Sequence, residues 1–270
     1  MTEIFEYEFM RNALAAGLLV SVACGVIGTF VVLNRMVFVS AGIAHAAYGG
    51  IGLGYFAGFN PVLGAVGFSV AAALGMGAIE RAARQRTDTV IGVIWAAGMA
   101  LGILLIDLTE GYKADLMGYL FGSILAVPTF DLWIMLGLDV VIVALAVLYY
   151  KELLAISFDE NFARIQNVPV DRLYLILMCM VGLTVVMMMR VVGLILVIAL
   201  LTIPPAIGAL FTRDMRKTMI LASFLGMIFT TIGLLVSFAF DLTSGAAIIL
   251  VSAVAYLAAL VIRSQGRAPS

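Results

Sequence analysis

The chain has 270 residues, of which 64% are hydrophobic and only 11% are charged, and its formal net charge is −1. An ordinary soluble domain carries about 25% charged residues. A globule of this length exposed to water on all sides has no way to bury so much apolar surface. The composition therefore excludes a soluble domain and indicates a protein embedded in a membrane.

Nine apolar segments have the length that a membrane-spanning helix needs, about 20 residues for a hydrocarbon core of roughly 30 Å. Only helices and closed barrels satisfy their backbone hydrogen bonds inside lipid, and barrel strands alternate in polarity, which these segments do not. We expect an all-α integral membrane protein, a polytopic bundle of about eight or nine transmembrane helices. The segments are 10–33, 38–57, 61–81, 88–107, 131–150, 172–189, 191–212, 217–240 and 244–262.

The stretch 115–126 is apolar but too short to cross, so we expect a re-entrant or interfacial helix there. Basic residues set the orientation of the whole chain. With the N-terminus outside, 12 of the 15 lysines and arginines fall on the inner side, against 3 in the reverse orientation. Because inner loops carry the excess of lysine and arginine, we predict the N-terminus outside and the C-terminus inside. The acidic start, MTEIFEYEFMRN, favours a retained first helix over a signal peptide.

The second apolar segment contains the only histidine of the chain, His45, within the glycine- and alanine-rich run AGIAHAAYGGIGLGYFAG. Small residues let helix backbones approach closely, so we expect this segment to pack against other helices. A polar side chain inside a membrane is costly and marks a functional site by default, although a hydrogen bond to a neighbouring helix is the simpler explanation. Imidazole is a common ligand of transition-metal ions, so His45 is our first candidate for an ion contact.

Two further features interrupt the apolar segments. Asp139 lies in the middle of 131–150, where a carboxylate has to be protonated, paired or hydrated, so it is the second candidate for an ion path. Pro204 and Pro205 lie within 191–212. Proline removes a helix hydrogen bond, and we expect the pair to break the helix, either as a hinge or as a plain kink.

The longest inner loop, 151–171, is amphipathic, with Phe158, Phe162 and Ile165 at helical spacing. Asp159 is a suitable N-cap for a short helix, and Asn167 tolerates the left-handed conformation that ends one. One interpretation is a connector that lies on the membrane. The other is a helix that docks into a groove of a partner through apolar anchors three and four residues apart.

Six segments, in this order, resemble the permease subunit of the metal-ion ABC transporters of the ABC-3 type, which move zinc, manganese or ferrous iron across bacterial inner membranes. The segments are LNRMVFVSAGIAHAAYGGIGLGY (33–55), DTVIGVIWAAGMALGILLI (88–106), LFGSIL (120–125), ELLAISFDENFARIQNVPV (152–170), VVGLILVIALLTIPPAIGALFT (191–212) and SGAAIILV (244–251).

The resemblance implies one permease domain over 1–270, with 151–171 as its cytoplasmic coupling loop, in a bacterial or archaeal cell inner membrane. It implies alternating access by a homodimer with two ATP-binding cassette ATPase subunits and an extracytoplasmic metal-binding protein. The ATPase groove is expected to receive Phe158, Asp159, Phe162 and Ala163. The sequence has no phosphate-binding glycine loop with Lys-Ser/Thr. We therefore expect a transport subunit without ATPase activity, with membrane lipid around it, no cofactor except the transported divalent ion, and no nucleic-acid partner.

The sequence departs from the family pattern at Ala41. The family usually carries an aspartate four residues before the histidine, on the same helix face, but this chain has alanine there. Two alternatives therefore remain: a permease for a metal chelate such as a siderophore or cobalamin, and a stand-alone secondary transporter. The latter is expected to show two related halves with discontinuous helices, which we do not find. An intramembrane enzyme needs a cluster of reactive groups, and one histidine with scattered carboxylates does not supply it.

Overall fold

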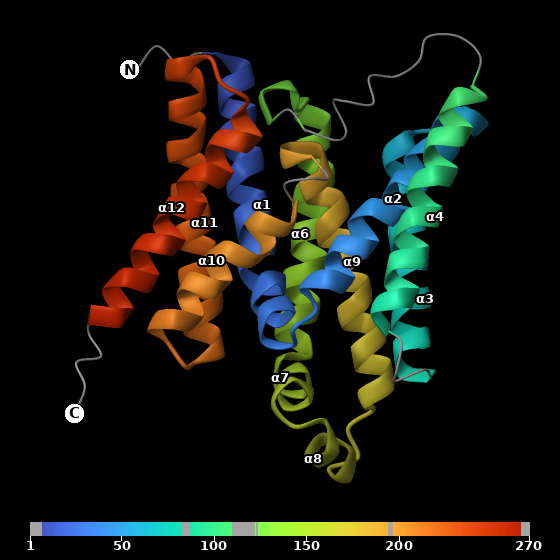
Figure 1. Ribbon diagram of the computed structural model, residues 1–270, viewed down its shortest axis with the longest axis vertical. Coiled ribbons are helices and arrows are strands. Elements are labelled where there is room, and N and C mark those ends of the chain that lie inside the picture. The colour runs from blue at the N-terminus through green and yellow to red at the C-terminus, as the bar shows by residue number, and fades with distance from the viewer. Residues whose placement is uncertain (1–6, 83–86, 110–121, 123, 194–196, 266–270) are drawn as a thin grey trace. The chain divides into compact units, whose positions relative to one another are not determined.

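The computed structural model describes residues 7–82, 87–109, 122, 124–193 and 197–265, and within these ranges every regular element is a helix (Figure 1). Eight of these helices are long and apolar enough to cross a membrane, and a ninth apolar helix, Val197–Phe211, is shorter. The prediction of an all-α membrane protein with eight or nine spans is confirmed. The predicted helix at 115–126 lies mostly outside the described residues, and only the 3₁₀ turn η2 (Ile124–Ala126) falls within them.

The chain forms two compact units, which we describe separately. The first unit comprises Met1–Val32, Met117–Val141 and Met188–Ser270, and the second comprises Leu33–Leu116 and Ile142–Met187. Helices α1, α6 and α9 each contribute residues to both units.

The first unit is built from most of α1, the first part of α6, and the three C-terminal helices. Close backbone approaches join α1 to α11, where Gly25 lies against Ser223, and α11 to α12, where Gly233 lies against Ile248. A methyl group on either glycine would overlap backbone atoms of the opposite helix. Helix packing in lipid depends on such contacts, since no water is expelled between the helices. The helices are α1 (Glu8–Leu33), α6 (Thr129–Leu148), α10 (Val197–Phe211), α11 (Met215–Phe240) and α12 (Ser244–Gln265).

Helix α10 continues through Pro204 and Pro205, both of which are buried. Our expectation that this pair breaks the helix was wrong. Pro205 has no N–H to donate to the carbonyl of Leu201, four residues earlier. That carbonyl oxygen instead lies against Gly28 of α1, where any side chain would overlap it. The carbonyl of Leu201 is thus covered by Gly28, and α10 is continuous across the two prolines.

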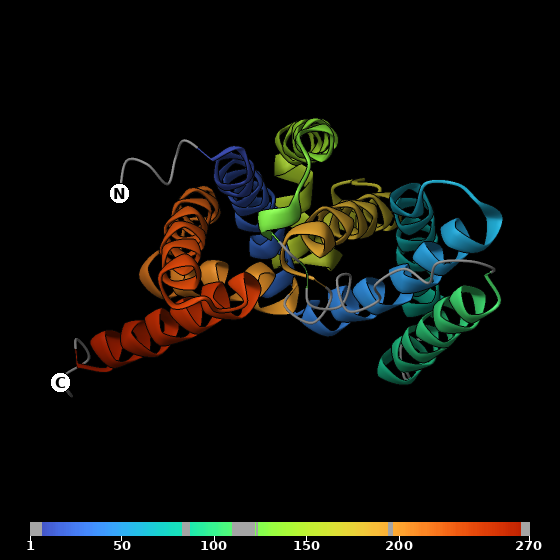
Figure 2. The same ribbon diagram turned by 90° about the horizontal axis from the view of Figure 1, so that it is seen from above.

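In the second unit α2 lies between α3 and α4 and contacts both, as Figure 2 shows. Gly50 of α2 lies against the carbonyl of Gly64 on α3, and a Cβ on Gly98 of α4 would be 2.7 Å from the Cα of Ala46. The prediction that the glycine-rich segment packs against other helices is confirmed. The unit comprises α2 (Val37–Ala57), α3 (Pro61–Ala82), α4 (Thr87–Asp107), the end of α6, α7 (Tyr150–Phe158), α8 (Glu160–Ile165) and most of α9 (Val170–Val192).

The α2–α3 contact yields a test of stability. Gly50→Ala places a methyl group on the carbonyl of Gly64, and forced overpacking of this kind costs about 1–3 kcal/mol. We therefore expect a lower unfolding temperature in detergent. The matched control is Gly67→Ala on α3, where nothing lies within 4 Å of the added methyl and helix propensity favours alanine by up to about 1 kcal/mol. Equal unfolding temperatures for the two variants would contradict the backbone contact.

Candidate functional site

His45 lies in α2, half-buried, with its Nδ1 2.9 Å from the carbonyl oxygen of Ala41. Because a carbonyl oxygen only accepts hydrogen bonds, Nδ1 carries the proton and donates it. The other ring nitrogen, Nε2, therefore keeps its lone pair. Histidines that bind metal ions are oriented in this way, with the second ring nitrogen donating to a carbonyl or a carboxylate. The orientation of His45 is thus the one found in metal-binding histidines, which makes it a candidate ligand.

A second contact fixes the ring of His45 from the neighbouring helix. The indole of Trp95 on α4 stacks on the imidazole, with 4.1 Å between ring centroids and 27° between ring planes. Phe38, at the start of α2, lies 6.0 Å from the same indole. Sequence reasoning did not single out Trp95, because it stands in an apolar run without a motif of its own. Only the close packing of α4 on α2 reveals its role.

Ala41 is buried, with 3% of its surface exposed, and occupies the position where the resemblance leads us to expect an aspartate. Its backbone carbonyl orients His45, but its side chain offers no ligand. Among the described residues, no three histidine, cysteine, aspartate or glutamate side chains gather closely enough to enclose a metal ion. His45 therefore remains a candidate ligand that belongs to no such group among the described residues.

Asp139 lies in α6, within the first unit, with 5% of its surface exposed. Its Oδ1 atom has no hydrogen-bond partner. An unpaired polar atom away from water costs free energy, so Asp139 remains the second candidate residue. His45 and Asp139 belong to different compact units, and each is a candidate within its own unit.

The loop 151–171 contains α8 and nearly all of α7, which meet at Asp159. The carboxylate of Asp159 accepts a hydrogen bond of 3.0 Å from the backbone N–H of Phe162 and so caps α8. Asn167 follows the helix with φ 58°. The predictions of a capping Asp159 and a left-handed Asn167 are confirmed.

The coupling residues divide by exposure. Phe158 is 71% exposed and Phe162 is 56% exposed, and Asp159 is exposed between them. Ala163 is completely buried and faces the interior of its own unit. Two large apolar side chains and one carboxylate are thus exposed on the loop, while Ala163 is buried.

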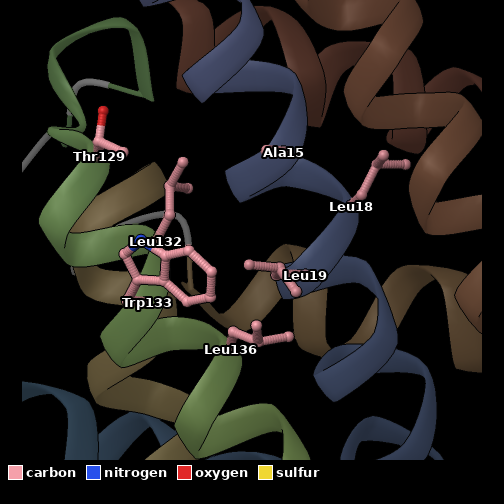
Figure 3. A pocket seen from close by; sticks show the side chains of 7 residues that line it. All are labelled: Ala15, Leu18, Leu19, Thr129, Leu132, Trp133 and Leu136. Carbon is pink, nitrogen blue, oxygen red and sulfur yellow. The ribbon is translucent and has the colours of Figure 1, made fainter.

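An apolar cavity of about 370 Å³ opens between α1 and α6 in the first unit (Figure 3). Figure 3 shows Leu19 of α1 facing Trp133 and Leu136 of α6. Leucine and tryptophan side chains dominate its lining, and Thr129 brings the one hydroxyl group. A divalent ion prefers oxygen, nitrogen or sulfur ligands, so this cavity suits an apolar occupant and is not the ion site.

These features define an integral membrane protein with several spans, an exposed amphipathic loop, and a glycine-rich helix that carries His45 and packs between two others. The model of the ABC 3 transport family matches residues 6–263, so the chain belongs to this family. It is a multi-pass membrane permease of the ABC type.

Known proteins resemble the chain over nearly all of its length. It is 59% identical, over 97% of the chain and 94% of the relative, to an uncharacterised membrane protein of Synechocystis sp.. It is 37% identical, over 95% of the chain and 91% of the relative, to the manganese transport system membrane protein MntC of Listeria monocytogenes. The solved structure of PsaBC from Streptococcus pneumoniae in complex with Fab matches with a TM-score of 0.86 and 32% identity, covering 95% and 92% of the two chains.

The stacking of His45 on Trp95 provides an optical test. The chain has two tryptophans, so Trp133→Phe leaves Trp95 as the only indole. We expect Co²⁺, a paramagnetic ion that imidazole binds well, to quench the fluorescence of this variant in detergent. Adding His45→Ala should abolish most of the quenching, because the ligand beside the indole is removed. Quenching of the same strength in the double variant would exclude His45 as the ligand.

Proposed function

We propose that this permease imports manganese, as one of two identical copies driven by ATP-binding cassette ATPases and supplied by an extracytoplasmic metal-binding protein. The observation that carries the proposal is the 37% identity with a manganese transport system membrane protein over 95% of the chain. A permease for a metal chelate is not supported by this relative. The chain itself supplies the path and does not hydrolyse ATP, in keeping with its lack of a phosphate-binding glycine loop.

His45 contacts the ion through Nε2. Mn²⁺ favours oxygen ligands over a neutral imidazole, and Ala41 leaves the same helix face without a carboxylate. The resulting contact is uncharged and weak. Transport requires binding strong enough for entry and weak enough for release, so a single oriented imidazole suits an ion in passage.

Asp139 is a candidate carboxylate contact within the first unit. Its buried, unpartnered Oδ1 belongs to the ligand class that Mn²⁺ prefers. A cation or a proton at this atom removes the cost of leaving it unpaired. We assign Asp139 to a second contact on the ion path.

The loop 151–171 receives the driving force from the ATPase. Phe158, Asp159 and Phe162 are exposed for docking, and Ala163 packs beneath them. Apolar anchors at helical spacing are the means by which a short helix binds a groove. Closure of the two ATPases on ATP then moves this loop and switches the permease from outward-open to inward-open.

Transport by the whole complex tests the proposal. In proteoliposomes with the ATPase, ATP and a manganese-loaded binding protein, we expect manganese uptake that stops without ATP. His45→Ala should reduce uptake to background while the complex remains assembled, because no other imidazole is available. ATPase activity unaffected by every metal-loaded binding protein would refute the proposed function. Wild-type uptake by His45→Ala would remove only His45 from the path.

Docking can be measured separately from transport. We expect Phe158→Ala and Phe162→Ala each to weaken ATPase binding by about 2 kcal/mol, the size typical of an aromatic anchor in an interface. Binding of labelled ATPase to the purified permease gives the dissociation constant. Phe130→Ala is the matched control, because Phe130 is 69% exposed but lies at the opposite end of α6 from the loop. An unchanged dissociation constant for both loop variants would disprove this docking surface.

A further inference from the structure

Arg81, near the end of α3, contacts both α8, which we call the coupling helix, and α9. Its guanidinium lies 2.5 Å from Oε1 of Glu160, the first residue of α8, and 3.2 Å from Oδ1 of Asp171 at the start of α9. It also lies 4.2 Å from the centre of the Tyr174 ring. The Arg81 side chain is only 20% exposed, so water screens these contacts less than it screens an ordinary surface ion pair. One side chain thus joins three helices.

The same carboxylates bind a second arginine. Arg164 of α8 lies 3.0 Å from Glu160 and 2.8 Å from Asp171. We call Arg81, Glu160, Arg164 and Asp171 the charge latch. Partial burial acts to raise the pKa of Glu160, but the hydrogen bonds and charges of Arg164 and Arg81 outweigh it and hold this pKa below its ordinary value of 4.5. A carboxyl group with a lowered pKa keeps its full stabilising effect above its ordinary pKa and loses it as the pH falls through the lowered one. At neutral pH Glu160 is therefore ionised and all the ion pairs of the charge latch are formed.

The tyrosine beneath Arg81 is itself held in place. The hydroxyl of Tyr174 donates a hydrogen bond to Oε2 of Glu80, the residue before Arg81. α9 is therefore tied to α3 both through the ring of Tyr174 and through its hydroxyl. Tyr174, against which Arg81 packs, is thus held in place by two contacts with α3.

A second tie joins the loop to α2. Nδ2 of Asn34, in the turn before α2, donates a hydrogen bond of 2.9 Å to Oγ of Ser157 in the last turn of α7. The two short helices of the loop are thus connected to different partners, α7 to the turn before α2 and α8 to α3.

Tight packing extends the connection from α3 to the helix of His45. Gly50 of α2 lies against Gly64 of α3, and Oγ of Ser69 on α3 donates a hydrogen bond of 3.3 Å to the carbonyl of Gly182 on α9. Glycine contacts leave no room for one helix to slide past the other without overlap. A continuous series of contacts thus runs from α8 through α3 to α2.

We propose that Arg81 transmits the movement of the coupling helix to α3, and through α3 to the helix that bears His45. Arg81 is a positioning residue, because it acts through its contacts with Glu160, Asp171 and Tyr174. Glu160 and Arg164, the charged residues within α8, are engaged with their own subunit, so Phe158, Asp159 and Phe162 are left for the ATPase. The inference rests on the proposed function, since it requires an ATPase that moves the loop.

The test is the number of manganese ions imported per ATP hydrolysed by the reconstituted complex. For Arg81→Gln we expect this ratio to fall by about tenfold, the size of effect that loss of one coupling contact produces, while the ATPase remains bound. Arg81→Lys keeps the charge but loses the planar fork that contacts several groups at once, so it should recover part of the ratio. Arg172→Gln, at an exposed arginine next to Asp171, is the matched control and should behave as wild type.

Glu160→Gln breaks the same ion pair at its more exposed partner. This variant replaces Arg81→Gln in the test if Arg81→Gln does not fold. A fall in the ratio for this variant supports the inference equally. A wild-type ratio for either variant in an assembled complex overturns it. Wild-type protein that hydrolyses ATP without importing metal would instead show that the proposed function fails, and the inference would fall with it.

Discussion

The second unit depends on direct backbone contact between α2 and its two neighbours. Lipid supplies no hydrophobic drive for helix association, so packing at small residues has to hold the helices together. In α2 the glycines meet a carbonyl of α3 on one side and the backbone of α4 on the other. The short interhelical distance that results lets Trp95 reach His45 from α4, and it leaves no space between the backbones of α2 and α3 at Gly50 and Gly64. The same small residues therefore explain both the contact between Trp95 and His45 and the close packing of α2 on α3.

Much of the fold was predictable because hydropathy and segment length report directly on the membrane. Local signals were equally informative where one residue determines the backbone, as Asp159 does at the start of α8 and Asn167 does after its end. The Pro204-Pro205 pair shows the limit of such signals. Proline removes a hydrogen bond in any helix, but whether the helix continues depends on what covers the freed carbonyl of Leu201, and that is decided by Gly28 about 170 residues away in sequence.

The candidate site was predictable only in part, for the same reason. His45 and Asp139 stood out because polar residues are rare in apolar segments, and the structure places Asp139 in a buried position without a partner for Oδ1. Trp95 and Arg81 did not stand out, because an aromatic residue in an apolar run and an arginine at a helix end are ordinary. Their contacts join residues 50 positions apart in one case and 79 in the other, and no local pattern encodes such pairs.

The hydrogen bond between His45 and the backbone carbonyl of Ala41 orients the imidazole without involving the side chain of residue 41. A backbone carbonyl is present whatever side chain the residue carries, so the imidazole keeps its tautomer and direction independently of the identity of residue 41. The side chain at that position is then free to vary. A carboxylate there would add a negative charge beside the imidazole without any change in the helix that orients the histidine.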